Sequence, residues 1–133
     1  MDFKLDSFEK HNDFRGNLVV FLDKKTLTKK DLNFGQIYFV TFNKKGVVRG
    51  NHYHKKWREW FGVVEGILEV RLKDVFTGEE KEFLLDNNSE KYTRLEIGPN
   101  IIHAFKSISE KASLLNYANG EWSNDDTFAI KLI

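Results

Sequence analysis

Residues 49–66 read R-G-N-H-Y-H-K-K-W-R-E-W-F-G-V-V-E-G, and this stretch decides the fold. Side chains alternate between the two faces of a β-strand, so His52 and His54 are expected on one face and Tyr53 on the other. Glu59 follows a few residues later. Two imidazoles and a carboxylate that face one space can hold a divalent metal ion or transfer protons.

A later segment, Gly98-Pro99-Asn100-Ile101-Ile102-His103, supplies another histidine. The chain has 4 histidines, and the remaining one, His11, lies in a polar stretch where we expect it to be solvated. The plainer alternative is that the clustered histidines are half-buried polar residues on ordinary strands.

Outside this stretch, the apolar residues fall in short runs rich in Val, Ile, Phe and Tyr, with turn residues between them. Many short, regularly spaced strands predict an all-β sandwich or barrel. A helical turn is expected only at residues 26–32. The expected strands are residues 18–22, 36–42, 49–54, 59–64, 67–74, 81–85, 93–97, 104–107, 113–117 and 128–132.

The clearest alternation lies in residues 67–74, where Leu68, Val70 and Leu72 share one face and charged side chains share the other. Residues 75–80 then predict a turn, and residues 82–85 a returning strand. Together they predict a hairpin with one buried and one solvated face.

Composition narrows the function classes. A chain of 133 residues is expected to form one domain, residues 1–133, large enough to bury a core. A net charge of +1 with interspersed signs predicts no nucleic-acid partner, and no apolar run approaches the roughly 20 residues of a membrane span. The absence of cysteine excludes disulfides and thiolate chemistry. With no apolar signal core near the N-terminus, the expected location is the cytoplasm.

The spacing H-x-H-x4-E-x6-G, followed by G-P-N-x2-H, resembles the two signature motifs of the cupin superfamily. The second motif is shortened, and Asn100 stands where a glycine is usual. The resemblance implies a small all-β jelly-roll barrel, the double-stranded β-helix, whose strands point alternate residues into one mouth. The motif residues expected to converge there are His52, His54, Glu59 and His103.

Two further elements resemble cupins that act on nucleotide sugars. They are Asp13-Phe14-Arg15-Gly16-Asn17-Leu18, like the D-x-R-G-x-L opening, and Arg49-Gly50-Asn51-His52-Tyr53-His54, like the core R-G-x-H-(Y/A)-(Q/H). The resemblance runs over residues 8–128. The group includes dTDP-4-dehydrorhamnose 3,5-epimerases, the WxcM-like dTDP-4-oxo-6-deoxyglucose 3,4-ketoisomerases, and the C-terminal cupin of capsule-biosynthesis reductases.

The chain shares features with more than one of these types. Its size, the place of Tyr38, and the pair Lys55 and Lys56 resemble the ketoisomerases. The gap of four residues before Glu59 resembles the capsule-enzyme cupin, which implies zinc binding. Residues 121–122 are Glu and Trp where 3,5-epimerases carry a tyrosine pair, which counts against a plain 3,5-epimerase.

The resemblance implies an isomerase or epimerase that acts on a dTDP-4-keto-6-deoxyhexose through an enediolate, in deoxysugar and surface-polysaccharide biosynthesis. Histidine suits such proton transfer because its ordinary pKa lies near neutrality, and arginine can grip a diphosphate with two donors. The implied catalytic residues are His52, His54 and Tyr38. The implied substrate-binding residues are Arg15, Arg49, Lys56, His103 and Trp122.

No cofactor is required in this interpretation, but His52, His54, Glu59 and His103 would be the ligands if a divalent metal such as zinc is bound. Two alternatives stay open: a metal-binding cupin without catalysis that serves as a sugar-binding or accessory protein, and a metal-dependent isomerase or oxygenase of a free small molecule. Arg15 and Arg49 favour the nucleotide-sugar interpretation.

Aromatic residues add two expectations. Trp57, Trp60 and Trp122 can stack on a sugar or base, or they can belong to the core or an interface. The 12 phenylalanines supply more apolar surface than one small core needs, which predicts a homodimer.

Overall fold

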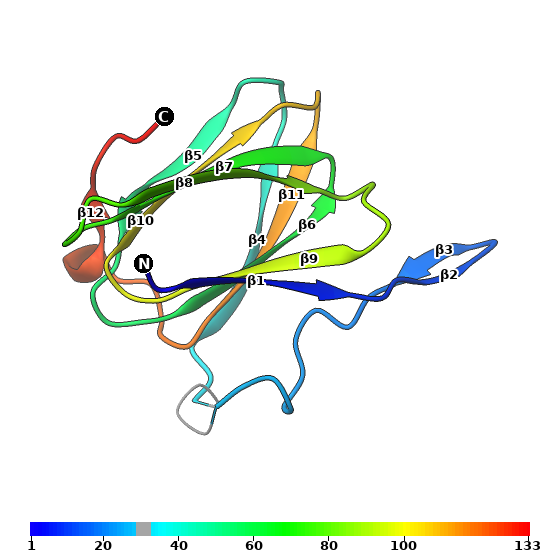
Figure 1. Ribbon diagram of the computed structural model, residues 1–133, viewed down its shortest axis with the longest axis horizontal. Helices are drawn as coiled ribbons and strands as arrows, with labels where there is room; N and C mark the ends of the chain where they lie inside the picture. Colours follow the sequence, from blue (N-terminus) through cyan, green and yellow to red (C-terminus); the bar gives the residue numbers. More distant parts are fainter. Residues whose placement is uncertain (29–32) are drawn as a thin grey trace.

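The computed structural model describes residues 1–28 and 33–133 and contains two antiparallel five-stranded sheets that face each other (Figure 1). The first sheet has the strand order β1 (Phe3–Phe8), β9 (Tyr92–Ile97), β6 (Glu59–Glu65), β11 (Ala112–Ala118) and β4 (Gln36–Phe42). The second has the order β12 (Phe128–Ala129), β5 (Val48–Tyr53), β10 (Ile101–Ser107), β7 (Ile67–Asp74) and β8 (Glu80–Asp86). This arrangement confirms the predicted all-β jelly-roll fold.

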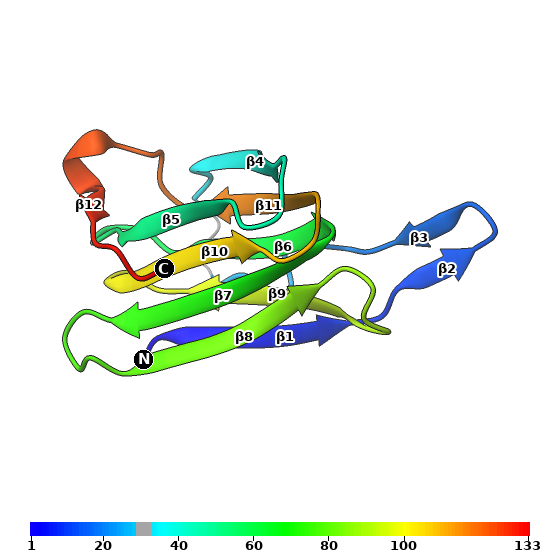
Figure 2. The ribbon, with the colours of Figure 1, turned by 90° about the horizontal axis from the view of Figure 1, so that it is seen from above.

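A small hairpin, β2 (His11–Asp13) and β3 (Gly16–Leu18), projects from the body as an arm (Figures 1 and 2). Every residue of the arm is exposed, and Phe14 at its tip is 99% exposed. Helical structure in the described part of the chain is one 3₁₀ turn, η1 (Asn124–Asp126). None of the described residues forms a helix with the length and hydropathy of a membrane span.

The predicted β7–β8 hairpin is confirmed, with Val70 opposite Phe83. Its inward residues Leu68, Val70 and Leu72 are fully buried, as the alternation predicts. They join a core cluster between the sheets. The other buried members of this cluster are Phe42, Phe61, Val63, Leu85, Leu95, Ile97, Ile101, Phe105, Ala112 and Leu114.

In the N-terminal third, one expected strand is wrong and one observed strand was not predicted. The strand predicted at residues 18–22 is wrong, because β3 ends at Leu18 and the following residues are irregular. The carbonyl of Phe21 in this segment accepts a hydrogen bond from the buried Arg94, at 2.8 Å, instead of a ladder partner. Strand β1, which pairs with β9 over its whole length, was not predicted. Residues 24–26 form a turn, and the helical turn expected at 26–32 extends over residues 29–32, which lie outside the described residues.

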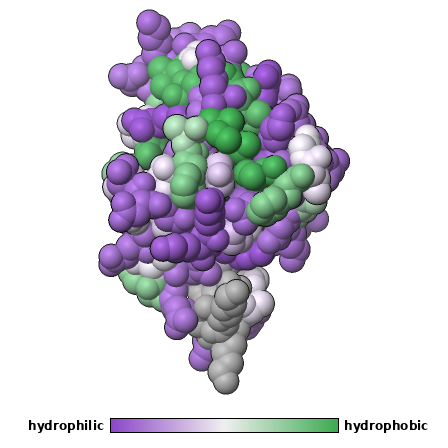
Figure 3. Space-filling model, turned by 90° about the vertical axis from the view of Figure 1, so that its left-hand side faces the viewer, coloured by the Kyte–Doolittle hydropathy of each residue, from purple (hydrophilic) through white to green (hydrophobic). Residues whose placement is uncertain are grey.

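The two sides of the space between the sheets differ. Apolar side chains fill it next to β7, β8 and β9. Strands β4 and β5 lie at the opposite side, where β4 is the edge of its sheet and only the short β12 lies beyond β5 (Figure 2). The face of the molecule that carries β12 and the C-terminal segment is mostly hydrophilic, with one gathered apolar patch (Figure 3). The candidate site lies on the β4–β5 side.

Candidate active site

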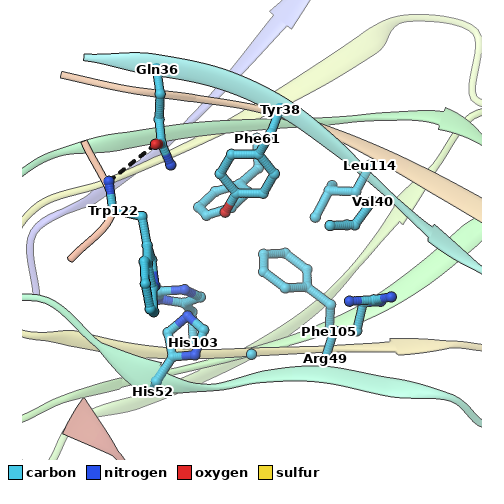
Figure 4. Close-up of a pocket in the computed structure, with 11 residues that line it drawn as sticks. Gln36, Tyr38, Val40, Arg49, His52, Phe61, His103, Phe105, Leu114 and Trp122 are labelled. Atoms are coloured by element: carbon cyan, nitrogen blue, oxygen red, sulfur yellow. Dashed lines mark hydrogen bonds between the residues drawn. The ribbon is translucent and has the colours of Figure 1, made fainter. Parts of the chain in front are cut away.

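A cavity of about 340 Å³ lies between β4 and β11 of one sheet and β5 and β10 of the other (Figure 4). This volume suits a small ligand or one part of a larger one. Figure 4 shows the Tyr38 ring entering from β4, across the cavity from His52 and His103. The lining residues are Gln36, Tyr38, Val40, Arg49, Gly50, His52, Phe61, His103, Phe105, Leu114 and Trp122.

The structure brings together three of the chain's histidines. One ring nitrogen from each of His52, His54 and His103 lies within 4.8 Å of the others. His52 stands opposite His103 in the β5–β10 ladder, and His54 is the first residue after β5. The Oε2 atom of Glu59 lies 3.8 Å from Nε2 of His54 and 3.7 Å from Nε2 of His103. The three histidines therefore form one cluster, and Glu59 lies beside two of them.

A β-bulge aims two residues of β5 into the same cavity. Arg49 and His52 are three residues apart, so a regular strand would place them on opposite faces. The β5–β10 register shifts here, because His52 pairs with His103 while Gly50 pairs with Ala104. Gly50 has φ +93° and Asn51 has φ +57°. A Cβ at Gly50 would lie 2.7 Å from the His103 carbonyl oxygen, so the close approach of the strands requires glycine here.

Main-chain groups fix the orientation of all three imidazole rings. Nδ1 of His54 lies 2.7 Å from the Asp126 carbonyl oxygen, Nδ1 of His103 lies 3.2 Å from that of Ile101, and His52 bonds the main chain of Gly50. A carbonyl oxygen can only accept, so the Nδ1 atoms of His54 and His103 donate. In the neutral rings the Nε2 atoms that face Glu59 then carry no proton.

Burial sets the charge state of this cluster. It lowers the pKa of His52 to about 4 and that of His103 well below its usual range, and it also lowers the pKa of His54. Burial raises the pKa of Glu59 to about 8, against hydrogen bonds from Asn116 and Trp57 that lower it. At neutral pH and without a metal ion, the histidines are neutral and Glu59 is protonated. The Glu59–histidine contacts are therefore not ion pairs.

Two further polar groups, Tyr38 opposite the histidines and Arg49 on the same strand as His52, are suited to different tasks. Burial and then the nearby Glu59 raise the pKa of Tyr38, so its phenol stays protonated and can donate a hydrogen bond or a proton. Although 37% of the whole residue is exposed, the hydroxyl points into the cavity (Figure 4). Arg49 also lines the cavity, and its Nε donates to the Thr41 carbonyl at 3.1 Å, which orients the guanidinium.

Two predicted substrate-binding residues lie away from the cavity of their own chain. Arg15 is in the projecting arm and pairs with Asp13, with Nη2 2.6 Å from Oδ2. The main-chain nitrogen of Lys56 donates to Asp126, and its side chain lines a separate groove beside Asp2. A role for either residue in substrate binding therefore has no support within a single chain.

The tryptophans separate into two kinds. Trp57 is buried and stacks on His54 at 4.3 Å between ring centroids, and Trp60 is buried against Tyr117. Stacking of either on a ligand is therefore excluded by burial. Trp122 is 54% exposed and lines the cavity.

Sequence reasoning missed several residues of the site. Gln36 lines the cavity, and its Oε1 accepts a hydrogen bond from the main chain of Trp122 at 3.1 Å. The alternation along β4 could have indicated it, because Gln36 and Tyr38 share one face. Asn100 has φ +65°, which explains an asparagine where a glycine is usual, and its nitrogen donates to the His54 carbonyl at 2.7 Å.

The donor set also fits a divalent metal ion. Three neutral imidazole nitrogens and a carboxylate are ligands that zinc accepts. Metal-binding histidines commonly donate their second nitrogen to a carbonyl or carboxylate, as His54 and His103 do here.

Solved structures with this fold include sugar-nucleotide enzymes. The QdtA 3,4-ketoisomerase from Thermoanaerobacterium thermosaccharolyticum, as a double mutant in complex with TDP, is 28% identical with a TM-score of 0.78, and the match covers 96% of this chain and 86% of that one. A 3,4-ketoisomerase from Helicobacter canadensis is 26% identical with a TM-score of 0.80, covering 96% and 90%. NovW, a 4-keto-6-deoxy sugar epimerase from Streptomyces spheroides, has a TM-score of 0.85 at 19% identity, covering 98% and 70%, and shows the fold alone.

A curated relative is the UDP-2-acetamido-2,6-beta-L-arabino-hexul-4-ose reductase of Pseudomonas aeruginosa strain PA103, which is 30% identical over 122 residues. The match covers 90% of this chain but only 30% of that protein. The family described as FdtA, WxcM-like, C-terminal matches residues 1–129. With nearly its whole length matched and the three motif histidines clustered at one cavity, this chain belongs to the family described as FdtA, WxcM-like, C-terminal.

Proposed function

We propose that this protein is an isomerase of nucleotide sugars that acts on a dTDP-4-keto-6-deoxyhexose as a 3,4-ketoisomerase or a C3/C5 epimerase. The observation that carries the proposal is a cavity in which neutral histidines face a protonated tyrosine, with an arginine beside them. Two 3,4-ketoisomerases, each more than 25% identical, share the fold over 96% of the chain.

The chemistry begins at the carbon next to the ketone. A 4-keto group acidifies the C3 hydrogen, and a neutral histidine takes that proton. The C–H electron pair then forms the C3–C4 double bond of an enediolate, whose charge rests on the C4 oxygen. Return of a proton to C4 with loss of the C3 hydroxyl proton gives the 3-keto sugar, whereas return to the other face of C3 gives the epimer. Neither route needs an oxidant.

The cavity distributes these roles among its residues. His52 lines the cavity and His54 lies directly behind it, with ring centroids 5.0 Å apart, so this pair takes and relays the proton. Tyr38 donates to the oxygen that becomes negative. Arg49 grips the diphosphate with its planar guanidinium. Trp122, exposed at the cavity, stacks on the sugar or the base.

Solvent exchange tests this mechanism. The protein is incubated with dTDP-4-keto-6-deoxyglucose in deuterated water and the sugar is followed by NMR. We expect deuterium at C3 or C4 together with a new keto sugar or epimer. If no carbon next to the keto group of any 4-keto sugar nucleotide exchanges, the enediolate mechanism is wrong and a binding-only cupin becomes the better interpretation.

The same cluster supports a second candidate, a metal-binding cupin that serves as a sugar-binding or accessory protein. Its support is the set of rings oriented by main-chain bonds around one point. The ligands would be His52, His54, Glu59 and His103, and a bound zinc or similar ion would polarise a carbonyl oxygen. Metal analysis of the purified protein and turnover after chelation separate this candidate from a metal-free isomerase.

The proposal includes a homodimer in which a second copy covers the outer face of the first sheet. On this face Ile37 is 60% and Phe39 is 71% exposed, and Ile37 lines an apolar groove of about 630 Å³. An isolated two-stranded hairpin such as the arm is marginally stable in water, and a twofold dimer would cover arm and groove together.

Sedimentation tests the dimer. We expect a species of twice the 15.6 kDa chain mass, and a variant with Phe39→Glu that is shifted toward the monomer. A clean 15.6 kDa species at micromolar concentration would contradict the proposal. A cytoplasmic location, in keeping with a chain that has no cysteine, stays a prediction.

A further inference from the structure

Asp126 is a buried acidic residue outside the cavity wall that no motif includes. It lies in η1, only 2% exposed. Its carboxylate accepts hydrogen bonds from the main-chain nitrogens of Lys55, at 3.1 and 3.2 Å to its two oxygens, and of Lys56, at 3.0 Å. The negative charge is thus held by backbone dipoles of the segment that directly follows His54.

The same residue also contacts the His54 ring. The carbonyl oxygen of Asp126 lies 2.7 Å from Nδ1 of His54, which is closer than the hydroxyl oxygen of Thr127. The Thr127 hydroxyl lies 3.5 Å from the ring but donates to the Ser123 carbonyl at 2.8 Å. One residue therefore holds both the imidazole of His54 and the chain immediately after it.

We propose that Asp126 is a positioning residue for His54: its carboxylate fixes the turn after the histidine, and its carbonyl holds the proton on Nδ1 so that Nε2 faces the cluster as a bare lone pair. The activity part of this inference rests on the proposed isomerase function; the tautomer part does not. Because Asp126 lies four residues beyond Trp122, its hydrogen bonds also connect one cavity wall to the segment that follows the histidine strand.

A purely structural role for Asp126 makes a different prediction. If the carboxylate merely caps a turn, its loss would lower stability and leave the ring of His54 unchanged in the molecules that stay folded. If it positions His54, the tautomer and the turnover change in the folded protein. The two roles are thus separated by a spectroscopic measurement.

The first measurement uses the unmodified, chelator-treated protein labelled with 15N in its histidines. A long-range 1H–15N correlation spectrum at neutral pH reports which ring nitrogen carries the proton, and loss of signals in His54→Asn assigns the peaks. We expect a neutral His54 ring with the proton on Nδ1. A ring protonated on Nε2 would overturn the proposal whether or not the protein has isomerase activity.

The second measurement compares Asp126→Asn and Asp126→Ala with the control Asp74→Asn. The Asp74 carboxylate likewise accepts two main-chain N–H bonds, from Phe76 at 2.8 Å and Thr77 at 3.0 Å, but in the turn between β7 and β8. We expect the Asp126 variants to give mixed His54 tautomers and a kcat roughly 10- to 100-fold lower, with KM nearly unchanged. The control should alter neither.

The outcomes are separable. Folded Asp126→Ala protein with an unchanged His54 spectrum would overturn the proposal, as would a loss of kcat that only follows the folded fraction. If Asp126→Ala does not fold, Asp126→Asn decides, since its amide oxygen retains one acceptor while its NH2 group cannot accept. Should the unmodified protein turn over no nucleotide sugar, the proposed function fails and the tautomer results still decide the role of Asp126.

Discussion

The two sides of the space between the sheets are built from the same strands but differ in content: apolar side chains fill the core side, whereas the cavity side adds histidines and Tyr38 to apolar wall residues that it shares with the core. On β6, Phe61 and Val63 belong to the core cluster, while Glu59 on the same face belongs to the histidine cluster. On β10, Phe105 packs in the core and His103, two residues earlier, faces the cavity. Strand period decides which residues point inward, and distance from the β4–β5 side decides whether they meet apolar neighbours or polar ones.

This difference indicates that stability and chemistry are separately encoded. The apolar side gains free energy by removing hydrocarbon from water, at about 25 cal/mol per Å². The polar side carries a stability cost, because it holds neutral histidines and a protonated glutamate away from solvent. Substitutions on the two sides should therefore act on different measurements.

The largest effect on activity should come from His54→Asn. The change is nearly isosteric, so the fold should persist while turnover falls by roughly 10²–10⁴-fold, or about 3–5 kcal/mol in activation free energy. Steady-state kinetics with circular dichroism as the folding control checks this. A folded His54→Asn variant with wild-type turnover would contradict the division of the protein into an apolar side that sets stability and a polar side that sets activity. The same measurement on His52→Asn shows which ring takes the proton.

Leu72→Ala should change the free energy of unfolding by about as much as His54→Asn changes the activation free energy. Leu72 is fully buried on the apolar side, so the cavity left behind should lower the free energy of unfolding by ~2–5 kcal/mol. The kcat of the folded fraction should stay within a few-fold of wild type. Urea unfolding and kinetics on one preparation test both parts, and a large loss of kcat without a loss of stability would contradict the division.

Sequence patterns predicted the apolar side better than the polar one. The alternation in β7 is local, so Leu68, Val70 and Leu72 were assigned to their face correctly. Strand β1 carries a weak pattern and is defined by pairing with β9, a partner distant in sequence, which leaves no local signal. The sequence of residues 19–22 is typical of a strand, but in the structure these residues are irregular and the side chain of Arg94 donates a hydrogen bond to the carbonyl of Phe21.

The site shows the same limit. The spacing of His52, His54 and Glu59 predicted that they lie close together, because it follows strand geometry and a known motif, and the structure places His54 beside both of the others. Of these three residues, His52 lines the cavity. Asp126 and Gln36 were missed because they act through hydrogen bonds with the main chain of residues far away in the sequence. Such contacts depend on tertiary structure and leave no spacing to recognise.

A smaller effect is expected from Arg49→Lys. An ammonium keeps the charge but loses the planar pair of donors, so KM for the nucleotide sugar should rise about tenfold while kcat changes little. Nucleotide titration by calorimetry gives an independent measure. Equal binding by both variants would show that the residue contributes only charge, or that the diphosphate binds elsewhere.

The smallest effect should be the pH dependence of stability in the metal-free protein. The pKa of His52 falls from 6.5 to about 4 on folding, so the unfolded chain binds more protons and stability rises with pH between these values. The pKa of Glu59 rises from 4.5 to about 8, so its contribution to stability falls with pH between those values. The contribution of His52 changes below pH 6.5, so between pH 6.5 and 8 the contribution of Glu59 makes the stability fall with pH.

Glu59→Gln should remove that fall. The free energies of unfolding from urea titrations at pH 6.5 and pH 8 should differ by about 1.6 kcal/mol more in wild type than in the variant, since one proton accounts for at most about 1.4 kcal/mol per pH unit. If the free energy of unfolding changed equally with pH in both proteins, Glu59 would be ionised in the folded state. Water would then reach the polar side more than its burial indicates.

The bulge at Gly50 and Asn51 determines which kinds of genetic change the site can survive. Point substitutions elsewhere on β5 leave the count of residues between Arg49 and His52 intact, and the cavity keeps both. Deleting Asn51 would leave Arg49 and His52 two residues apart, a spacing that a regular strand already places on one face, so both side chains would still face the cavity. A substitution at Gly50 that removes the bulge and keeps the residue count would instead turn one of the two side chains toward solvent, although every chemical group remains encoded. Functional descendants of this gene should therefore tolerate the loss of one residue here better than a larger side chain at Gly50.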